Sequence, residues 1–119
     1  MGQEIKKIVD AQLKFEYKLV QIIQYHECLY NTSHQSFNDE LYRNAVWESI
    51  ASQLNVPSKY CRERWKGILQ RFTEEIQWQN MFRATSFWLL FHHLDFLNRI
   101  APNYYFLPMD IDTFQDTSQ

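Results

Sequence analysis

Four stretches of the chain place apolar side chains at the spacing of three to four residues that is typical of amphipathic α-helices. The clearest stretch predicts a helix from Ser58 to about Gln77, in which apolar positions recur at steps of 4, 3, 4 and 4 and so share one face. These positions are Cys61, Trp65, Ile68, Phe72 and Ile76. Pro57 and Ser58 indicate where this helix begins, because a serine hydroxyl can accept a hydrogen bond from an amide of the first turn.

Two further helices are predicted before it. Residues 3–29 contain no glycine or proline and carry an apolar stripe, formed by Ile5, Ile8, Val9, Phe15, Leu19, Ile22, Ile23 and His26. A polar connection follows, and Asn38 is expected to cap a second helix. The side chains expected to be buried on this second helix are Ala45, Trp47, Ile50, Ala51 and Leu54. Only residues 55–57 then separate it from the third helix, which is typical of a helix-turn-helix.

Large apolar residues dominate residues 81–107. A fourth helix is predicted over residues 86–100, and it carries more large side chains than one helical face can bury. Two interpretations remain open. Either the excess covers a small core, or part of it forms a surface for a partner protein or for self-association. The candidates for such partner contacts are Trp88, Phe91 and Tyr105.

Composition favours one folded, all-α domain. Apolar residues make up 45% of the 119 positions, and only two glycines and three prolines interrupt the helical patterns. We expect the domain to cover residues 1–107, followed by an acidic and polar tail over residues 108–119. The centre of the core is expected to consist of Trp47, Trp65, Ile68 and Phe72.

Charge is unevenly distributed along the chain. The formal net charge is −2, but residues 59–80 hold five cations and three acids. The candidates for contacts to DNA phosphates or base edges are Lys59, Arg62, Lys66 and Arg71. The alternative is a solvated helix face on which the three acids pair with these cations. With so few cations, any DNA binding is expected to be weak and sensitive to salt.

No residue pattern predicts catalysis or a bound cofactor. Cys28 and Cys61 lie 33 residues apart, which fits neither a metal site nor a redox motif, and no two histidines show zinc-finger spacing. The chain has no nucleophile motif and no phosphate-binding loop. It also shows no signal peptide and no apolar run of membrane length. We therefore expect no enzyme activity, no metal, no cofactor, no small-molecule substrate and no membrane partner.

The order and spacing of these residues resemble the MADF domain, a Myb/SANT-like module of insect transcription and chromatin regulators. The resemblance covers about residues 15–97. It consists of Leu19-x-x-Ile-Ile, Cys28-Leu29-Tyr30-Asn31 with His34 and Phe37, Trp47-x-x-Ile-Ala-x-x-Leu54, Cys61-x-x-x-Trp65-Lys66, and Trp88 with Leu94-x-Phe96-Leu97. Two positions depart from the family's pattern. Leu69 stands where arginine is usual, and Gly67 lies inside the third helix, where glycine costs about 1 kcal/mol relative to alanine.

The resemblance implies a Myb/SANT-like core of three helices with a helix-turn-helix, an additional C-terminal helix and no catalytic activity. It also implies a nuclear protein. We expect the domain to act mainly as a protein-interaction module whose partners are chromatin proteins or transcription regulators. Direct DNA binding through the third helix is the alternative.

Overall fold

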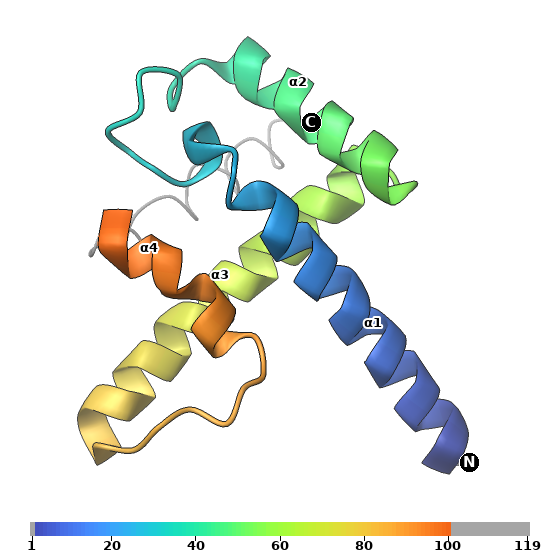
Figure 1. Ribbon diagram of the computed structural model, residues 1–119, viewed down its shortest axis with the longest axis vertical. Helices are drawn as coiled ribbons and strands as arrows, with labels where there is room; N and C mark the ends of the chain where they lie inside the picture. Colours follow the sequence, from blue (N-terminus) through green and yellow to red (C-terminus); the bar gives the residue numbers. More distant parts are fainter. Residues whose placement is uncertain (1, 101–119) are drawn as a thin grey trace.

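The computed structural model describes residues 2–100, and its ordered elements over this range are all helical (Figure 1). In chain order they are α1 (Gly2–Ile23), the 3-10 helix η1 (Glu27–Leu29), α2 (Glu40–Leu54), α3 (Ser58–Phe82), the 3-10 helix η2 (Phe91–Leu94) and α4 (Asp95–Ile100). The expected all-α fold class is thereby confirmed for these residues. Tyr105 and the predicted tail over residues 108–119 lie outside the described residues.

Helix α1 is shorter than predicted, and only its C-terminal half enters the core. The helix ends at Ile23, after which the chain turns and the Tyr30 hydroxyl donates to the backbone oxygen of Gln24. Leu19 and Ile23 are fully buried. Ile5, Ile8 and Val9 are 55–66% exposed, so the N-terminal part of the apolar stripe lies outside the core. A helix of 22 residues is about 33 Å long, and its N-terminal half projects past the helices on which it packs (Figure 1).

Helix α2 begins one residue later than predicted. Its cap is Asp39, whose Oδ1 accepts a hydrogen bond from the backbone N–H of Tyr42 at 3.0 Å. Trp47, Ile50 and Ala51 are buried as predicted, and Leu54 packs against the core. The prediction for Ala45 is wrong, because this residue is exposed. The buried face of α2 instead contains Arg43 and Val46.

A tight turn connects α2 to α3. Asn55 adopts the left-handed conformation (φ 59°), and its N–H bonds to the carbonyl oxygens of Ala51 and Ser52. Ser58 does not cap α3 as predicted; its hydroxyl donates to Glu48 Oε2 at 2.7 Å, which joins α2 to α3. Helix α3 runs to Phe82, five residues beyond the predicted end at Gln77.

One face of α3 is continuously buried. Cys61, Trp65, Ile68 and Phe72 are at most 2% exposed, and Ile76 is partly buried against the same core. Leu69, which departs from the family pattern, is also fully buried, so it serves as a core residue. Helices α1 and α2 both pack on α3 (Figure 1). The fold is therefore organised around this helix.

The predicted fourth helix is largely absent. Residues 83–88 have no helical structure, and α4 contains only six residues after η2. The hydroxyl of Ser86 accepts a hydrogen bond from the N–H of Trp88 at 3.1 Å, which stabilises a non-helical backbone at this point. Most of the apolar excess is core: Leu90, Phe91, Leu94, Phe96 and Leu97 are buried. Phe87 and Leu89 are the exceptions, at 92% and 70% exposed.

Both cysteines are free thiols inside the core. Burial raises the pKa of Cys28 and of Cys61, and nearby Glu48 raises that of Cys61 further. Both therefore remain protonated at neutral pH and serve as small apolar residues.

We predict that Trp65→Ala lowers the free energy of unfolding by about 3–5 kcal/mol, because Trp65 is 0% exposed and its loss leaves a large cavity. Urea denaturation followed by circular dichroism measures this loss. Trp78→Ala is the matched control. Trp78 lies on the same helix but is 38% exposed, so its replacement should lower the free energy of unfolding much less. Equal losses in the two variants would contradict the core described above.

We also predict that Gly67→Ala raises the free energy of unfolding by about 1 kcal/mol. Gly67 lies in the interior of α3, its φ is not positive, and a Cβ there would meet no atom within 4 Å. Alanine therefore reduces the entropy of the unfolded chain without creating strain. The same denaturation experiment measures the difference, and a lower midpoint than that of the original chain would show that the site is not open.

Candidate nucleic-acid interface

The N-terminal half of α3 carries cationic side chains on its outer surface. Lys59 is exposed, and Arg62 and Lys66 are partly exposed. Glu63 is the acidic residue of residues 58–70. Since α3 is the second helix of the helix-turn-helix, this surface occupies the position from which recognition helices contact DNA.

Arg64 is a partly exposed cation that is engaged in an ion pair within the domain. Its guanidinium pairs with the carboxylate of Glu16 on α1, which is 8% exposed. Pairing offsets the cost of removing this carboxylate from water. Arg64 therefore joins α1 to α3 and is not available to an external ligand in the way that Lys59 is.

Arg62 is held at the junction of α2 and α3. Its Nη2 donates to Asn44 Oδ1 at 2.6 Å, and its guanidinium lies 5.8 Å from the centroid of the Trp47 ring. These contacts fix the direction of the side chain before any ligand arrives, which lowers the entropy that binding would have to remove.

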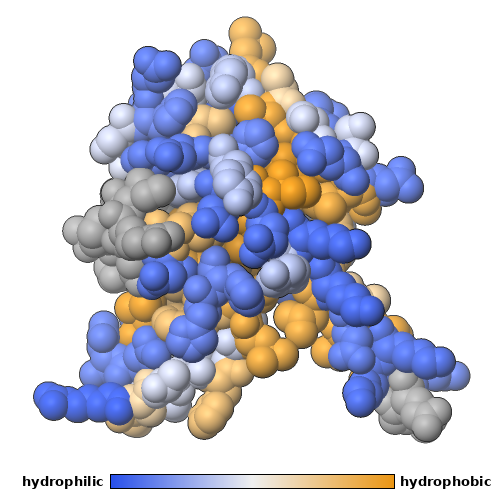
Figure 2. Space-filling model, viewed as in Figure 1, coloured by the Kyte–Doolittle hydropathy of each residue, from blue (hydrophilic) through white to orange (hydrophobic). Residues whose placement is uncertain are grey.

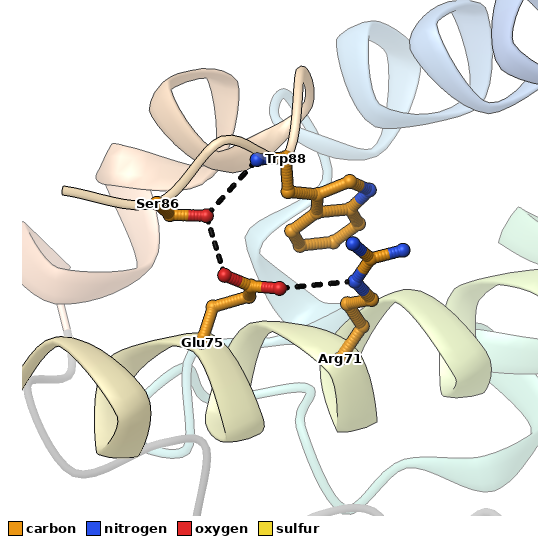
Figure 3. A network of polar contacts seen from close by, with 4 residues as sticks. All are labelled: Arg71, Glu75, Ser86 and Trp88. Atoms are coloured by element: carbon orange, nitrogen blue, oxygen red, sulfur yellow. Dashed lines mark hydrogen bonds and ion pairs between the residues drawn. The ribbon is translucent and has the colours of Figure 1, made fainter.

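The structure separates Arg71 from the other candidates. Arg71 Nε lies 3.2 Å from Glu75 Oε2, and its guanidinium lies 5.0 Å from the centroid of the Trp88 ring (Figure 3). Glu75 Oε1 in turn accepts a hydrogen bond from the Ser86 hydroxyl at 2.5 Å. This network attaches residues 86–88 to α3 (Figure 3). Arg71 is 53% exposed, and it thus differs from Arg62 in that its partners belong to the second half of α3 and to residues 86–88.

The residues predicted to contact a partner protein are placed differently from one another. Phe91 is buried at 9% exposed, with 5.4 Å between its ring centroid and that of Phe72, so it packs in the core. Trp88 is partly buried under Arg71. Tyr105 lies outside the described residues.

Sequence analysis did not identify the most exposed apolar side chains of this region. These are Met81, Phe82, Phe87 and Leu89, with exposures of 60–92%. Exposure alternates from Phe87 to Leu90, since Trp88 and Leu90 point inward and their neighbours point outward. An analysis restricted to helical spacing could not detect this alternation.

Other kinds of site find no support in the part of the chain that the structure describes. No group of three or more His, Cys, Asp or Glu side chains gathers there in a way that could hold a metal ion. None of the helices within residues 2–100 combines the length and apolar character that a bilayer crossing requires.

Comparison with known proteins identifies a family and a curated relative. The family described as "Alcohol dehydrogenase transcription factor Myb/SANT-like", whose domain is named MADF, matches residues 19–97. Transcription factor Adf-1 of Drosophila melanogaster is 28% identical over 91 residues, which are 75% of this chain and 33% of Adf-1. The chain thus spans about a third of the length of this curated relative. No solved structure matches the chain.

The family is of the transcription-factor type and is not known as enzymatic. Its match covers both tryptophan-bearing helices, the turn between them and the buried segment up to Leu97. From this match and the helical fold we conclude that the chain belongs to the MADF family of Myb/SANT-like transcription factor domains.

Proposed function

We propose that this domain is part of a nuclear transcription regulator and binds DNA through the N-terminal half of α3. The observation that carries the proposal is the outer surface of residues 58–70. Lys59, Arg62 and Lys66 are accessible there on the second helix of a helix-turn-helix, with Glu63 as the acid among them. The family match supports a role in transcription regulation, because the related protein Adf-1 is named as a transcription factor.

The two halves of α3 differ in charge. Residues 58–70 contain four cations and one acid, whereas residues 71–82 contain one cation and two acids. A phosphate backbone would be attracted to the first half and repelled by the second. DNA is therefore expected to lie across the end of α3 near the α2–α3 turn, away from the network around Arg71.

Affinity should be modest. Three accessible cations neutralise few phosphates, so counterion release contributes little to the binding free energy. The chain's net charge of −2 adds no general attraction to DNA. A site of this kind binds DNA with limited affinity. Neighbouring domains or partner proteins would then contribute the rest of the binding free energy.

A protein-interaction module is the second candidate. It is favoured by the cluster of exposed apolar side chains at the end of α3 and in the following segment, which includes Phe82 and Phe87 at 60% and 92% exposed. Its partners would be chromatin proteins, other transcription regulators or a second copy of this chain. Of the candidates named from the sequence, Trp88 is partly exposed and borders this surface, whereas Phe91 is buried at 9% exposed.

We predict that Lys59→Ala combined with Lys66→Ala weakens binding to a mixed-sequence duplex and reduces the salt dependence. Each lost phosphate contact should lower the slope of log K against log salt by about 0.9. Fluorescence anisotropy at several salt concentrations measures both quantities. Lys6→Ala with Lys7→Ala, on the projecting end of α1, is the control with the same charge change. An unchanged slope in the α3 variant would exclude this surface as the DNA site.

We further predict that Arg71→Ala leaves the affinity and the salt slope unchanged but destabilises the domain by about 1 kcal/mol. The side chain is 53% exposed, so its ion pair with Glu75 is partly screened and the stacking on Trp88 adds a similar small amount. Thermal unfolding and anisotropy on the same sample test both parts. A reduced salt slope in this variant would extend the DNA surface to the second half of α3.

A further inference from the structure

A groove of about 340 Å³ lies between α1 and the segment that leads into η2. Its walls are almost entirely apolar and include Leu13 and Tyr17 from α1 and Leu89 and Leu90 from the other side. Leu89 is 70% exposed. Figure 2 shows hydrophobic surface in the hollow between the projecting end of α1 and the C-terminal half of α3. An apolar surface of this shape is typical of a site that accepts a peptide segment.

The rim of the groove is cationic. Lys14 and Lys18 lie on successive turns of α1, are both exposed, and both line the groove. His93 completes the lining and contacts the Tyr17 ring edge-on, with 4.8 Å between ring centroids. No carboxylate of the described residues lines it. An apolar floor with a lysine rim fits a segment that combines large apolar side chains with acidic ones.

We propose that the occupant is a segment of this same chain, residues 104–116. The chain continues for 19 residues beyond α4, all outside the described part of the structure. Residues 101–119 contain three aspartates, at positions 110, 112 and 116, and no lysine, arginine or histidine. Their large apolar side chains are Tyr104, Tyr105, Phe106, Leu107, Met109, Ile111 and Phe114. The composition of this segment thus complements that of the groove in both charge and hydrophobicity.

The distance along the chain permits this docking. Helix α4 follows η2 directly and has six residues, so it carries the chain only about 9 Å from the element that contributes His93. Residues 101–103 connect α4 to the proposed segment and can span about 10 Å when extended, which is comparable to that distance. The segment can therefore return to the groove without any rearrangement of the helices. Because the groove and its lysines are separate from the α3 surface, the inference does not depend on DNA binding.

The test is amide hydrogen exchange of the full chain, read by mass spectrometry over residues 104–116. In the original chain these amides should exchange at least about tenfold more slowly than unprotected ones, which corresponds to about 1.4 kcal/mol of docking free energy. Lys14→Glu with Lys18→Glu should remove this protection, and so should Leu89→Asp, a change at an exposed side chain. Lys6→Glu with Lys7→Glu makes the same charge change on α1 outside the groove and should preserve it.

The decisive comparison exchanges the charges of the segment and of the groove. Asp110→Lys with Asp112→Lys should remove protection from the original chain and restore it when combined with Lys14→Glu and Lys18→Glu. Unprotected amides in the original chain would overturn the proposal. Protection that survives both groove variants would also overturn it, since the segment would then dock elsewhere. Protection that rises with protein concentration would assign the groove to the segment of a second copy and would equally reject docking within one chain.

Discussion

The continuous buried face of α3 is the constraint on which the rest of this domain depends. Trp65, which is fully buried, is part of this face, and both α1 and α2 pack on α3. Large aromatic side chains bury more apolar surface than any other residue type, so the full burial of Trp65 contributes strongly to this core. The positions of the turn, of the cationic surface and of η2 all follow from the way in which the other elements meet α3.

This arrangement gives the two halves of α3 separate roles. The first half meets α2 at the tight turn and directs cations outward, while Arg64 and Glu16 fix the crossing with α1. The second half uses Arg71 and Glu75 to retain the segment that returns from the end of the helix. A cation on α3 therefore cannot be assigned to ligand binding from its spacing alone, because its partner can lie on an element distant in sequence.

The sequence predicted the elements whose formation depends on local periodicity. Helices α2 and α3, the turn between them and the burial of Trp47 and Trp65 follow from apolar spacing and from the residues at the turn. The exposure of Ile5 was not predictable, because the stripe on α1 continues past the helices that could cover it. The break near Ser86 depends on a hydrogen bond to Glu75, eleven positions earlier. Of the candidate site, the sequence identified the cations but not the internal partners of Arg62 and Arg71.

The two buried thiols have a consequence for the dynamics of the domain. A thiol with a raised pKa inside a packed core reacts with an alkylating reagent only when its surroundings open. Cys28 lies in η1, and Cys61 lies at the end of the first turn of α3. Their relative rates of modification therefore report two different opening reactions, one of the loop that follows α1 and one of the helix-turn-helix itself. The chain thus contains, without any added label, a pair of reporters that distinguishes local loosening from loss of the whole core.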